Sequence, residues 1–375
     1  MRRTLMSVHR WTGLILGLFL AVEGLLGAWL VIAEPLDEWL HPEILQSQPQ
    51  AGSEPVGLAA AYDAVSEAHP DRPIWLLMQP DEPTGVYKAV LEGHHGPRVY
   101  VDAYTGAVLG ERAAFSTLET PIRVIHTGEF GGAWLETGMG ILAIAMLGLA
   151  ITGIVVWWPG WKWLRTGLGL STASLADLSR DGHRWAGLIG LPFLAIIAAS
   201  GIYLIFHHAV QDTVHAVTGE ETHFPPPIEL AEEAGPMPPD HVRAMVASAR
   251  EAVPEARITL LGFPTEAGRA VQARMRYPGE WHPIGNSRIL LHPDSGALLA
   301  AYDFQEAGPG DYAMDHLYPL HIGTYGGTAA RTAHFVAGLL PTLFLLTGTY
   351  IWWRRRKLRR KRARPRGGGA RAGSR

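Results

Sequence analysis

The chain has 375 residues, a formal net charge of −3, 17 histidines and no cysteine, and 47% of its residues are hydrophobic. The lack of cysteine excludes disulfides, thiolate metal sites and iron–sulfur clusters, which leaves histidine as the main ligand for a transition metal. Four apolar runs, at 11–33, 137–158, 185–206 and 333–353, are each long enough to cross a hydrocarbon core of about 30 Å as a helix. The composition therefore predicts a mainly α-helical membrane protein with four transmembrane helices.

The small net charge hides an uneven distribution of charged residues. The short segments 1–10, 159–184 and 354–375 carry 19 of the 32 Lys and Arg residues but only two acids. The long segments 34–136 and 207–331 carry 32 of the 35 Asp and Glu residues. Because basic residues are enriched on the cytoplasmic side of membrane proteins, we expect both termini in the cytoplasm and both long segments outside.

Two motifs occur twice in the chain. The stretches 9–14 (HRWTGL) and 183–188 (HRWAGL) share five of six residues, and each opens an apolar run. The stretches 125–132 (IHTGEFGG) and 320–327 (LHIGTYGG) each precede another apolar run, with 31 residues from the histidine to a Trp-Trp pair. The chain is therefore predicted to consist of two parallel repeats, related by a pseudo-twofold axis along the membrane normal.

The repeats predict an order of segments. They are a span at 1–34, an outer domain at 35–125, a span at 126–160, a cytoplasmic loop at 161–182, a span at 183–206, an outer domain at 207–320, a span at 321–354 and a basic cytoplasmic tail at 355–375. Glycines keep the chain irregular after the second motif until about Ala133. The tail follows a membrane helix and lacks interleaved aromatic residues, so we expect it to contact anionic lipid rather than nucleic acid.

Each outer domain shows the pattern of a helix on a small antiparallel α+β sheet. The predicted helices are 57–65 and 241–252, and the predicted strands are 74–78, 86–91, 98–101, 107–109, 257–261, 270–276 and 287–291. Prolines from Pro35 to Pro55 are expected to form a linker before the first domain. His94 and His95 lie in a turn flanked by glycines, where a solvated hairpin tip is favoured over a metal site.

The first apolar run allows two alternative interpretations. It resembles a secretory signal that ends at 31–33 (VIA), but it is about twice the length of a signal core of roughly 7–15 residues. Its counterpart in the second repeat is internal, so a membrane span is favoured. Glu23 lies near the middle of this span. It is either a functional ionisable group or a protonated acid that is hydrogen-bonded between helices, and Ile197 occupies the equivalent position.

Four histidines are the candidate metal ligands. The repeat symmetry places His9 opposite His183 near the inner face and His126 opposite His321 near the outer face. Two facing imidazoles on membrane helices are the axial ligands that a b-type haem requires. The alternative is that these are structural histidines at the membrane interface. Because they form two symmetric pairs inside repeated motifs, ligation of one or two haems is favoured.

Neighbouring residues fit the same hypothesis. Gly13 and Gly187 follow the inner histidines by four residues, on the same helix face, and would leave room for a flat macrocycle. Arg10 and Arg184 are expected to pair with haem propionates. Other histidines near the outer end could replace a proposed ligand; these are His207, His208 and His334. The histidines expected to be solvated are His215, His223, His282, His292 and His316.

Taken together, these motifs resemble the PepSY-associated transmembrane family. The resemblance rests on the HRWxGL openings, the His-x-Gly stretches, the Thr-Gly and Trp-Trp exits, and the turn at 102–109 (DAYTGAVL), and it covers about residues 5–356. The turn at 292–296 (HPDSG) departs from the pattern. The resemblance implies four helices that carry two outer PepSY domains, in the bacterial inner membrane. It also implies a role in iron uptake, since the family includes haem-containing reductases of ferric siderophores.

We therefore predict a ferric-siderophore oxidoreductase. Electrons would enter near the cytoplasmic face, pass the His9/His183 haem and then the His126/His321 haem, and reduce a ferric chelate outside. Fe²⁺ is softer and less charged than Fe³⁺, so hard oxygen ligands hold it less tightly. The chain has no Gly-x-Gly-x-x-Gly motif after a strand, so the electron donor is expected to be a membrane quinol or another reductase. The alternatives are a non-redox siderophore permease or sensor component, and a PepSY protein that regulates a protease.

Overall fold

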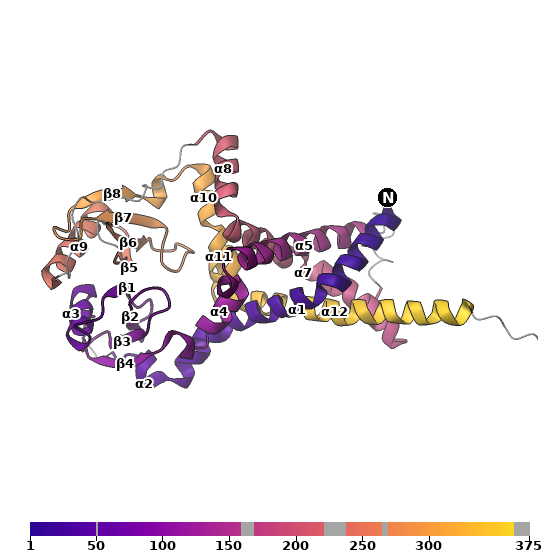
Figure 1. Ribbon diagram of the computed structural model, residues 1–375, viewed down its shortest axis with the longest axis horizontal. Coiled ribbons are helices and arrows are strands. Elements are labelled where there is room, and N and C mark those ends of the chain that lie inside the picture. Colours follow the sequence, from indigo (N-terminus) through magenta and orange to yellow (C-terminus); the bar gives the residue numbers. More distant parts are fainter. Residues whose placement is uncertain (50–51, 159–168, 221–237, 265–268, 364–375) are drawn as a thin grey trace, which may run out of the picture.

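The computed structural model describes residues 1–49, 52–158, 169–220, 238–264 and 269–363. Within these ranges, four helices are long and apolar enough to cross a membrane. They are α1 (Arg2–Leu40), α5 (Ala133–Trp157), α7 (Leu175–Ile205) and α12 (Gly327–Ala363). The helices form a bundle, and a β-sheet lies beyond one end of it (Figure 1). We call this end the sheet end, and the end that carries the N-terminus the terminal end.

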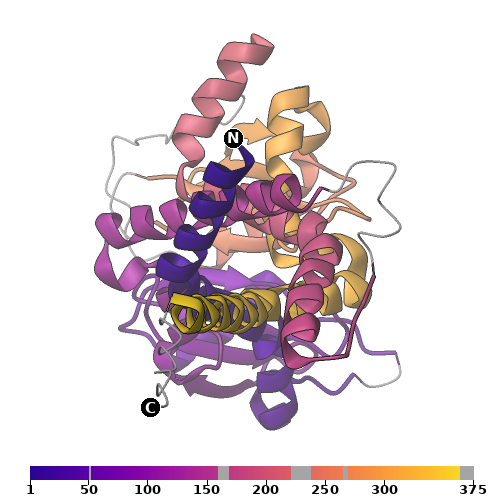
Figure 2. The same cartoon turned by 90° about the vertical axis from the view of Figure 1, so that its right-hand side faces the viewer.

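The four bundle helices form a closed ring of neighbours. α1 contacts α5 and α12, and α7 contacts the same two helices. α1 and α7 therefore lie across the ring from each other, and Figure 2 shows the bundle from its terminal end. α1 and α12 cross closely, because a Cβ atom at Gly338 would lie 2.7 Å from the backbone oxygen of Gly24. Small residues at such crossings let membrane helices pack by backbone contact.

The sheet contains the strands of both outer segments. Among the described residues its order is β4-β3-β2-β1-β5-β6-β7-β8, antiparallel throughout. The strands are β1 (Ile74–Met78), β2 (Val86–Leu91), β3 (Arg98–Asp102), β4 (Val108–Arg112), β5 (Arg257–Gly262), β6 (Val271–Arg276), β7 (Ser287–Leu291) and β8 (Leu298–Tyr302). The predicted strands are therefore present.

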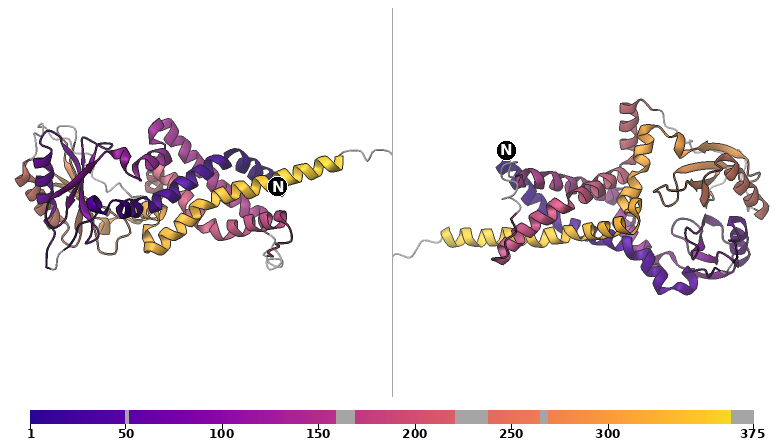
Figure 3. Two further views of the ribbon diagram at one scale, coloured as in Figure 1. Left: turned by 90° about the horizontal axis from the view of Figure 1, so that it is seen from below. Right: turned by 180° about the vertical axis from the view of Figure 1, so that it is seen from behind.

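The sequence predicts two separate outer sheets, whereas the structure joins them. β1 pairs with β5, with Leu77 opposite Leu261. Each would otherwise be an edge strand with unpaired backbone groups, and the pairing satisfies both. Helices α3 (Leu58–Ala68) and α9 (Pro239–Ala252) contact each other and share one hydrophobic core with the sheet. The two outer segments thus form one unit at the sheet end (Figure 3).

Short helices lie between the bundle and the sheet and at the margins of the sheet. They are α2 (Pro42–Leu45), η1 (Ala114–Ser116), α4 (Thr120–Thr127), η2 (Glu129–Gly131), α8 (His207–Thr218), η4 (Phe304–Glu306), α10 (Pro309–Asp315), α11 (Leu317–Ile322) and η5 (Thr324–Gly326). The predicted irregular stretch is confirmed. α4 ends at Gly128 (φ +80°) and α5 begins after Gly132 (φ +66°), and glycine adopts these positive φ values without strain.

Three helices extend beyond the predicted boundaries. α1 continues through Pro35 to Leu40, so the expected linker begins later. α7 begins at Leu175 rather than at His183, because the Ser174 hydroxyl accepts the Asp177 N–H and caps the helix. α12 carries the first part of the basic tail. The remainder of that tail, and much of the predicted cytoplasmic loop, lie outside the described residues.

Candidate functional site

The first histidine pair lies at the terminal end of the bundle. His9 is on α1 and His183 is on α7, so the two rings face each other across the ring of helices. Their centres are 6.5 Å apart and their planes are inclined by 81°. The repeat predicted that these two residues meet, and the structure brings them together.

Threonines from the other two helices orient these rings. His9 Nδ1 lies 3.0 Å from Thr152 Oγ1 on α5, and His183 Nδ1 lies 2.8 Å from Thr347 Oγ1 on α12. Each hydroxyl also donates to the carbonyl four residues earlier in its helix, at 2.7 Å for Thr152 and 2.6 Å for Thr347. A hydroxyl has one hydrogen, so each threonine accepts the Nδ1–H of its histidine. The lone pair of each ring is therefore on Nε2.

The second pair lies at the sheet end. His126 is on α4 and His321 is on α11, with ring centres 6.4 Å apart and planes inclined by 41°. His321 Nδ1 lies 3.0 Å from Ser200 Oγ and 3.1 Å from the Ile197 carbonyl. Ser200 donates its hydrogen to the Ile196 carbonyl at 2.7 Å. His321 therefore also carries its proton on Nδ1.

His126 has a charged partner instead. Its Nδ1 lies 2.8 Å from Glu23 Oε2 on α1, which is an ion-pair distance, but the two atoms do not have the geometry of a hydrogen bond. In the described part of the chain, all four imidazoles use Nδ1 for the polar contacts given above. Histidines that bind a metal through Nε2 are commonly held by such Nδ1–H contacts to a carboxylate, a carbonyl or a hydroxyl.

A glycine packs against each of the four rings. A Cβ atom at Gly153, Gly27 or Gly201 would lie 3.2–3.3 Å from Cε1 of His9, His126 or His321, and one at Gly348 would lie 3.7 Å from Cε1 of His183. Gly153 and Gly348 belong to the repeated Thr-Gly motif, in which the threonine orients the ring and the glycine gives it room. Gly27 and Gly201 occupy equivalent positions in the two repeats.

The two pairs are separate sites. Residues 9 and 23 of α1 differ by 14 positions, which corresponds to roughly 20 Å along a helix with a rise of 1.5 Å per residue. One metal ion cannot bind both pairs. Each pair combines one histidine from each half of the chain, so neither half forms a site alone.

The geometry of each pair fits a haem iron between two imidazoles. Two imidazoles that would each bind one metal ion from opposite sides, at about 2.0 Å, would have ring centres roughly 6 Å apart. The observed separations are 6.5 and 6.4 Å. A Cβ atom at Gly187 would meet nothing within 4 Å, and one at Gly13 would meet only a leucine methyl at 3.8 Å. Both glycines therefore face open space, and a macrocycle at this place stays a prediction.

The two arginines predicted to hold propionates differ. Arg10 stacks over Trp11 at 5.3 Å and contacts the Ser7 hydroxyl, and within the described residues it forms no ion pair. Arg184 lies 3.5 Å from the buried carboxylate of Asp181. Arg10 is therefore available to an anionic group, whereas Arg184 already has a carboxylate partner.

The alternative ligands do not join either pair. His334 is buried, and its two ring nitrogens lie 3.0 and 2.8 Å from the carbonyls of Ala330 and Leu320. His207 and His208 are exposed on α8, where their rings contact each other. The expectation that His282 is solvated is wrong, because it is 8% exposed beneath the sheet.

The other histidines expected to be solvated divide into three groups. His292 and His316 are only partly accessible, and the ring of His316 packs against Trp281 with centres 5.0 Å apart. His215 is partly buried against the carboxylate of Asp311. His223 lies outside the described residues.

Sequence reasoning found the four histidines but not all of their partners. Glu23 was identified as an unusual membrane acid without a partner, and the structure supplies His126. Ser200 was missed because Leu26 occupies its equivalent position in the first repeat. Only a comparison of the two halves at positions that differ could have indicated it.

Comparison with known proteins places the chain in a broader group. The family model described as "PepSY-associated TM region" matches residues 6–355, which is nearly the whole chain. No curated protein matches the sequence.

Proposed function

The chain belongs to the family of PepSY-associated transmembrane regions, and from this premise we propose that it is a haem-carrying membrane reductase of ferric siderophores. The observation that carries the proposal is the pair of histidine sites at the two ends of the bundle. In His9, His183 and His321 a hydroxyl holds Nδ1 and Nε2 keeps its lone pair, and Nδ1 of His126 lies 2.8 Å from the Glu23 carboxylate. A siderophore permease, a sensor component or a protease-regulating protein would have no use for two such sites.

The residues of each pair would hold a b-type haem, which supplies one-electron chemistry when bound. The threonines and Ser200 fix the orientation and tautomer of their rings, and Glu23 lies at ion-pair distance from His126. Arg10 offers a cation to a propionate at the terminal end.

The reaction requires one electron for each iron. A ferric chelate accepts the electron and becomes a ferrous chelate, and the hard oxygen ligands of the siderophore then hold the Fe²⁺ less tightly. The electron comes from a membrane quinol or a partner reductase on the terminal side. A ferric siderophore is too large to enter the bundle, so it would dock at the sheet end, near η2 and η5.

The charge distribution supports an orientation with the terminal end in the cytoplasm. The short segments there carry most of the basic residues, and the sheet unit carries most of the acids. We infer a location in the bacterial inner membrane, with the sheet outside and the basic end of α12 near anionic lipid. Reporter fusions after residues 100 and 280 would be active only outside the cytoplasm; cytoplasmic activity would reverse this orientation.

The proposed function is tested by purifying the full chain in mild detergent from haem-replete cells. We expect a low-spin spectrum of a haem with two histidine ligands, and a pyridine haemochrome assay that reports b-type haem. The reduced protein should be reoxidised by ferric siderophores but not by their gallium complexes. A colourless protein would refute the proposal and leave the permease and sensor alternatives.

A further inference from the structure

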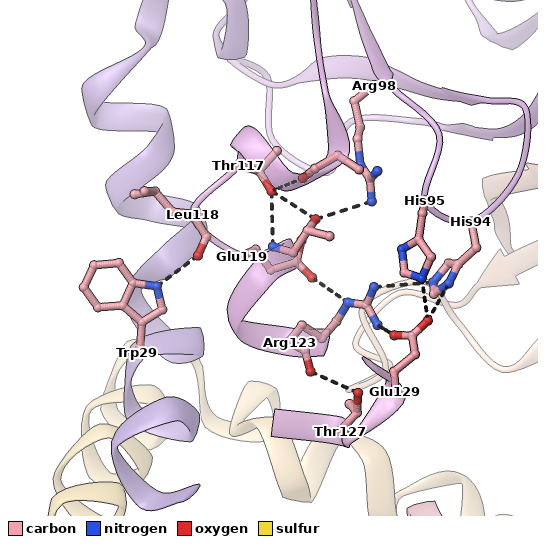
Figure 4. Close-up of polar contacts among 12 residues, drawn as sticks. Trp29, His94, His95, Arg98, Thr117, Leu118, Glu119, Arg123, Thr127 and Glu129 are labelled. Atoms are coloured by element: carbon pink, nitrogen blue, oxygen red, sulfur yellow. Dashed lines mark hydrogen bonds and ion pairs between the residues drawn. The ribbon is translucent and has the colours of Figure 1, made fainter. Parts of the chain in front are cut away.

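A second cluster of metal-ligating side chains lies next to the sheet-end pair. The hairpin between β2 and β3 carries His94 and His95, and its tip reaches the loop that follows α4 (Figure 4). There, Glu129 Oε1 lies 3.1 Å from His94 Nδ1 and 2.9 Å from His95 Nε2. The three ligand atoms lie within 4.8 Å of one another. The cluster thus joins two segments that are more than thirty residues apart in sequence.

The hairpin tip is rigidly built. A Cβ atom at Gly96 would overlap the backbone oxygen of Leu91, so only glycine fits this turn. Aromatic side chains support both imidazoles. The ring of Trp75 packs against His94, and the ring of Phe115 packs against His95, each with centres 5.5 Å apart. The two ligands are therefore oriented before any ion binds, which lowers the entropic cost of binding.

Glu129 is held from its other oxygen. Arg123 Nη1 lies 3.1 Å from Glu129 Oε2, and Arg123 Nε lies 3.4 Å from Glu119. Figure 4 shows Arg123 between the two acids. This arrangement leaves Oε1 directed at both imidazoles. A carboxylate that is fixed through one oxygen and offers the other is typical of the supporting contacts around metal ligands.

We propose that His94, His95 and Glu129 bind one first-row divalent transition-metal ion. Two imidazoles and one carboxylate are the ligand set of sites for ferrous iron and related metals. Neighbouring ligands of such an ion, at bond lengths of about 2.1 Å, are roughly 3 Å apart. The two measured nitrogen–oxygen distances match this spacing. Both histidines are partly exposed, which leaves coordination positions for water and a path for the ion.

A comparable cluster elsewhere lacks these features. His215, Glu220 and Asp311 also lie close together. However, both oxygens of Glu220 accept backbone N–H groups, from Gly310 at 3.0 Å and from Asp311 at 3.4 Å. These acids stabilise the start of α10 and the contact of α10 with α8. This cluster is therefore structural and serves as an internal control.

The position of the proposed site indicates which metal ion it would bind. Glu129 follows His126 by three residues, so the ion would sit beside the sheet-end pair. If the proposed function is correct, Fe²⁺ is released at this end, and the site would receive it; this assignment of the cargo rests on the proposed function. The second repeat has Thr324 at the position equivalent to Glu129, and Thr324 donates to the Trp281 carbonyl instead. A single ion per chain is therefore expected.

The test is a titration of the chelator-treated, detergent-purified full chain with Co²⁺, whose visible absorption reports coordination by nitrogen and oxygen. We expect one saturable site. His94→Ala, His95→Ala and Glu129→Gln should each weaken binding by at least about 100-fold, since loss of a supporting contact alone weakens metal binding by about 10- to 100-fold. Arg123→Ala should fall in that smaller range. His69→Ala and His215→Ala should leave binding unchanged.

Two results would overturn the site. One is unaltered Co²⁺ binding in His95→Ala and Glu129→Gln, and the other is loss of binding in His215→Ala alone. The same titration on a His9→Ala/His183→Ala variant separates this inference from the proposed function. Co²⁺ binding that persists there, whatever the haem content, shows that the site stands independently. An anaerobic repeat with Fe²⁺ then tests the cargo, and failure of Fe²⁺ to compete with Co²⁺ would reject iron as the ion.

Discussion

Glu23 Oε2 lies 2.8 Å from Nδ1 of His126, whereas the other sheet-end histidine contacts only neutral groups. The two histidines that are proposed to hold the sheet-end cofactor therefore have Nδ1 neighbours of different charge. A carboxylate makes its imidazole a stronger donor, and a hydroxyl does so less. The repeated motifs place two equivalent histidines opposite each other, and residues that are not repeated make their surroundings different.

Glu23→Gln removes this negative charge while keeping the shape of the side chain. Since the carboxylate favours the more positive oxidised iron, the variant should raise the midpoint potential of one haem only. For a one-electron couple each tenfold change in equilibrium corresponds to about 59 mV, and we expect a shift of this order. A spectroelectrochemical titration measures it. Ser200→Ala is the matched control and should have a smaller effect. Equal shifts of both haems would contradict the assignment of Glu23 to the sheet-end pair.

The pairing predicts which substitutions remove the same haem. His9→Ala and His183→Ala should each lose one haem, and His126→Ala and His321→Ala should each lose the other, because the members of a pair face each other at 6.4–6.5 Å. Haem content per chain is measured by the pyridine haemochrome assay, and each spectrum identifies the haem that remains. His334→Ala should retain both. Loss of one common haem in His9→Ala and His126→Ala would refute the arrangement.

Gly201 should tolerate no side chain larger than a methyl group. A Cβ atom there would lie 3.2 Å from Cε1 of His321, so the branches of valine would displace the ring. Gly201→Val should strongly reduce haem occupancy at the sheet end while the terminal end stays loaded. Gly138→Ala, on α5, is the control, because its Cβ atom would meet nothing within 4 Å. Full occupancy in Gly201→Val would show that the ring position is not confined.

His282 predicts how the stability of the outer unit changes with pH. Burial lowers its pKa to about 3, and Arg274 and Arg288 add to this effect. The unfolded chain binds a proton near pH 6.5 and the folded chain does not. Stability is therefore complete above about pH 6.5 and falls as the pH drops toward 3, by up to about 1.4 kcal/mol per pH unit. The midpoint temperature of thermal unfolding should therefore change less with pH in His282→Gln than in the wild type.

Asp315 has the opposite effect on the pH dependence of stability over part of this pH range. Burial raises its pKa to about 6, so its contribution is complete below about pH 4 and is lost as the pH rises through 6. The difference between wild type and variant is therefore the informative quantity, since Asp315 is common to both. Parallel pH curves for wild type and His282→Gln would exclude His282 as the acid-sensitive group.

Phe130 is an exposed aromatic residue in the region where the chelate is expected to dock. It lies on η2 with 63% of its surface exposed, whereas its counterpart Tyr325 packs against Trp281 and His334. Aromatic contacts contribute about 0.5–1.5 kcal/mol, so Phe130→Ala should slow reoxidation by ferric siderophores by roughly 2- to 10-fold, with an unchanged haem spectrum. Tyr325→Ala should have a smaller effect. Phe19→Ala, an exposed aromatic on α1, is the control, and equal rates in all of these variants would place docking elsewhere.

Much of the architecture could be predicted from local patterns. Apolar length identified the four spans, alternation identified every strand of the described sheet except β8, and glycines located the irregular stretch before α5. Helix ends were predicted less well. α7 starts at Leu175, eight residues before His183, because a serine caps it there and many polar residues have a good helix propensity outside the apolar run.

The sequence by itself determined which histidines could meet, because the duplication repeats each of them with its neighbours at the same spacing. It also showed that Thr152 and Thr347 lie in a repeated motif, but not that they contact His9 and His183. The tertiary structure decided the rest. The joining of the two sheets through β1 and β5, the contact of Glu23 with His126, and the meeting of His94 and His95 with Glu129 are long-range contacts between residues that are not repeated. No local periodicity encodes such contacts, because they depend on how separate segments pack once the chain has folded.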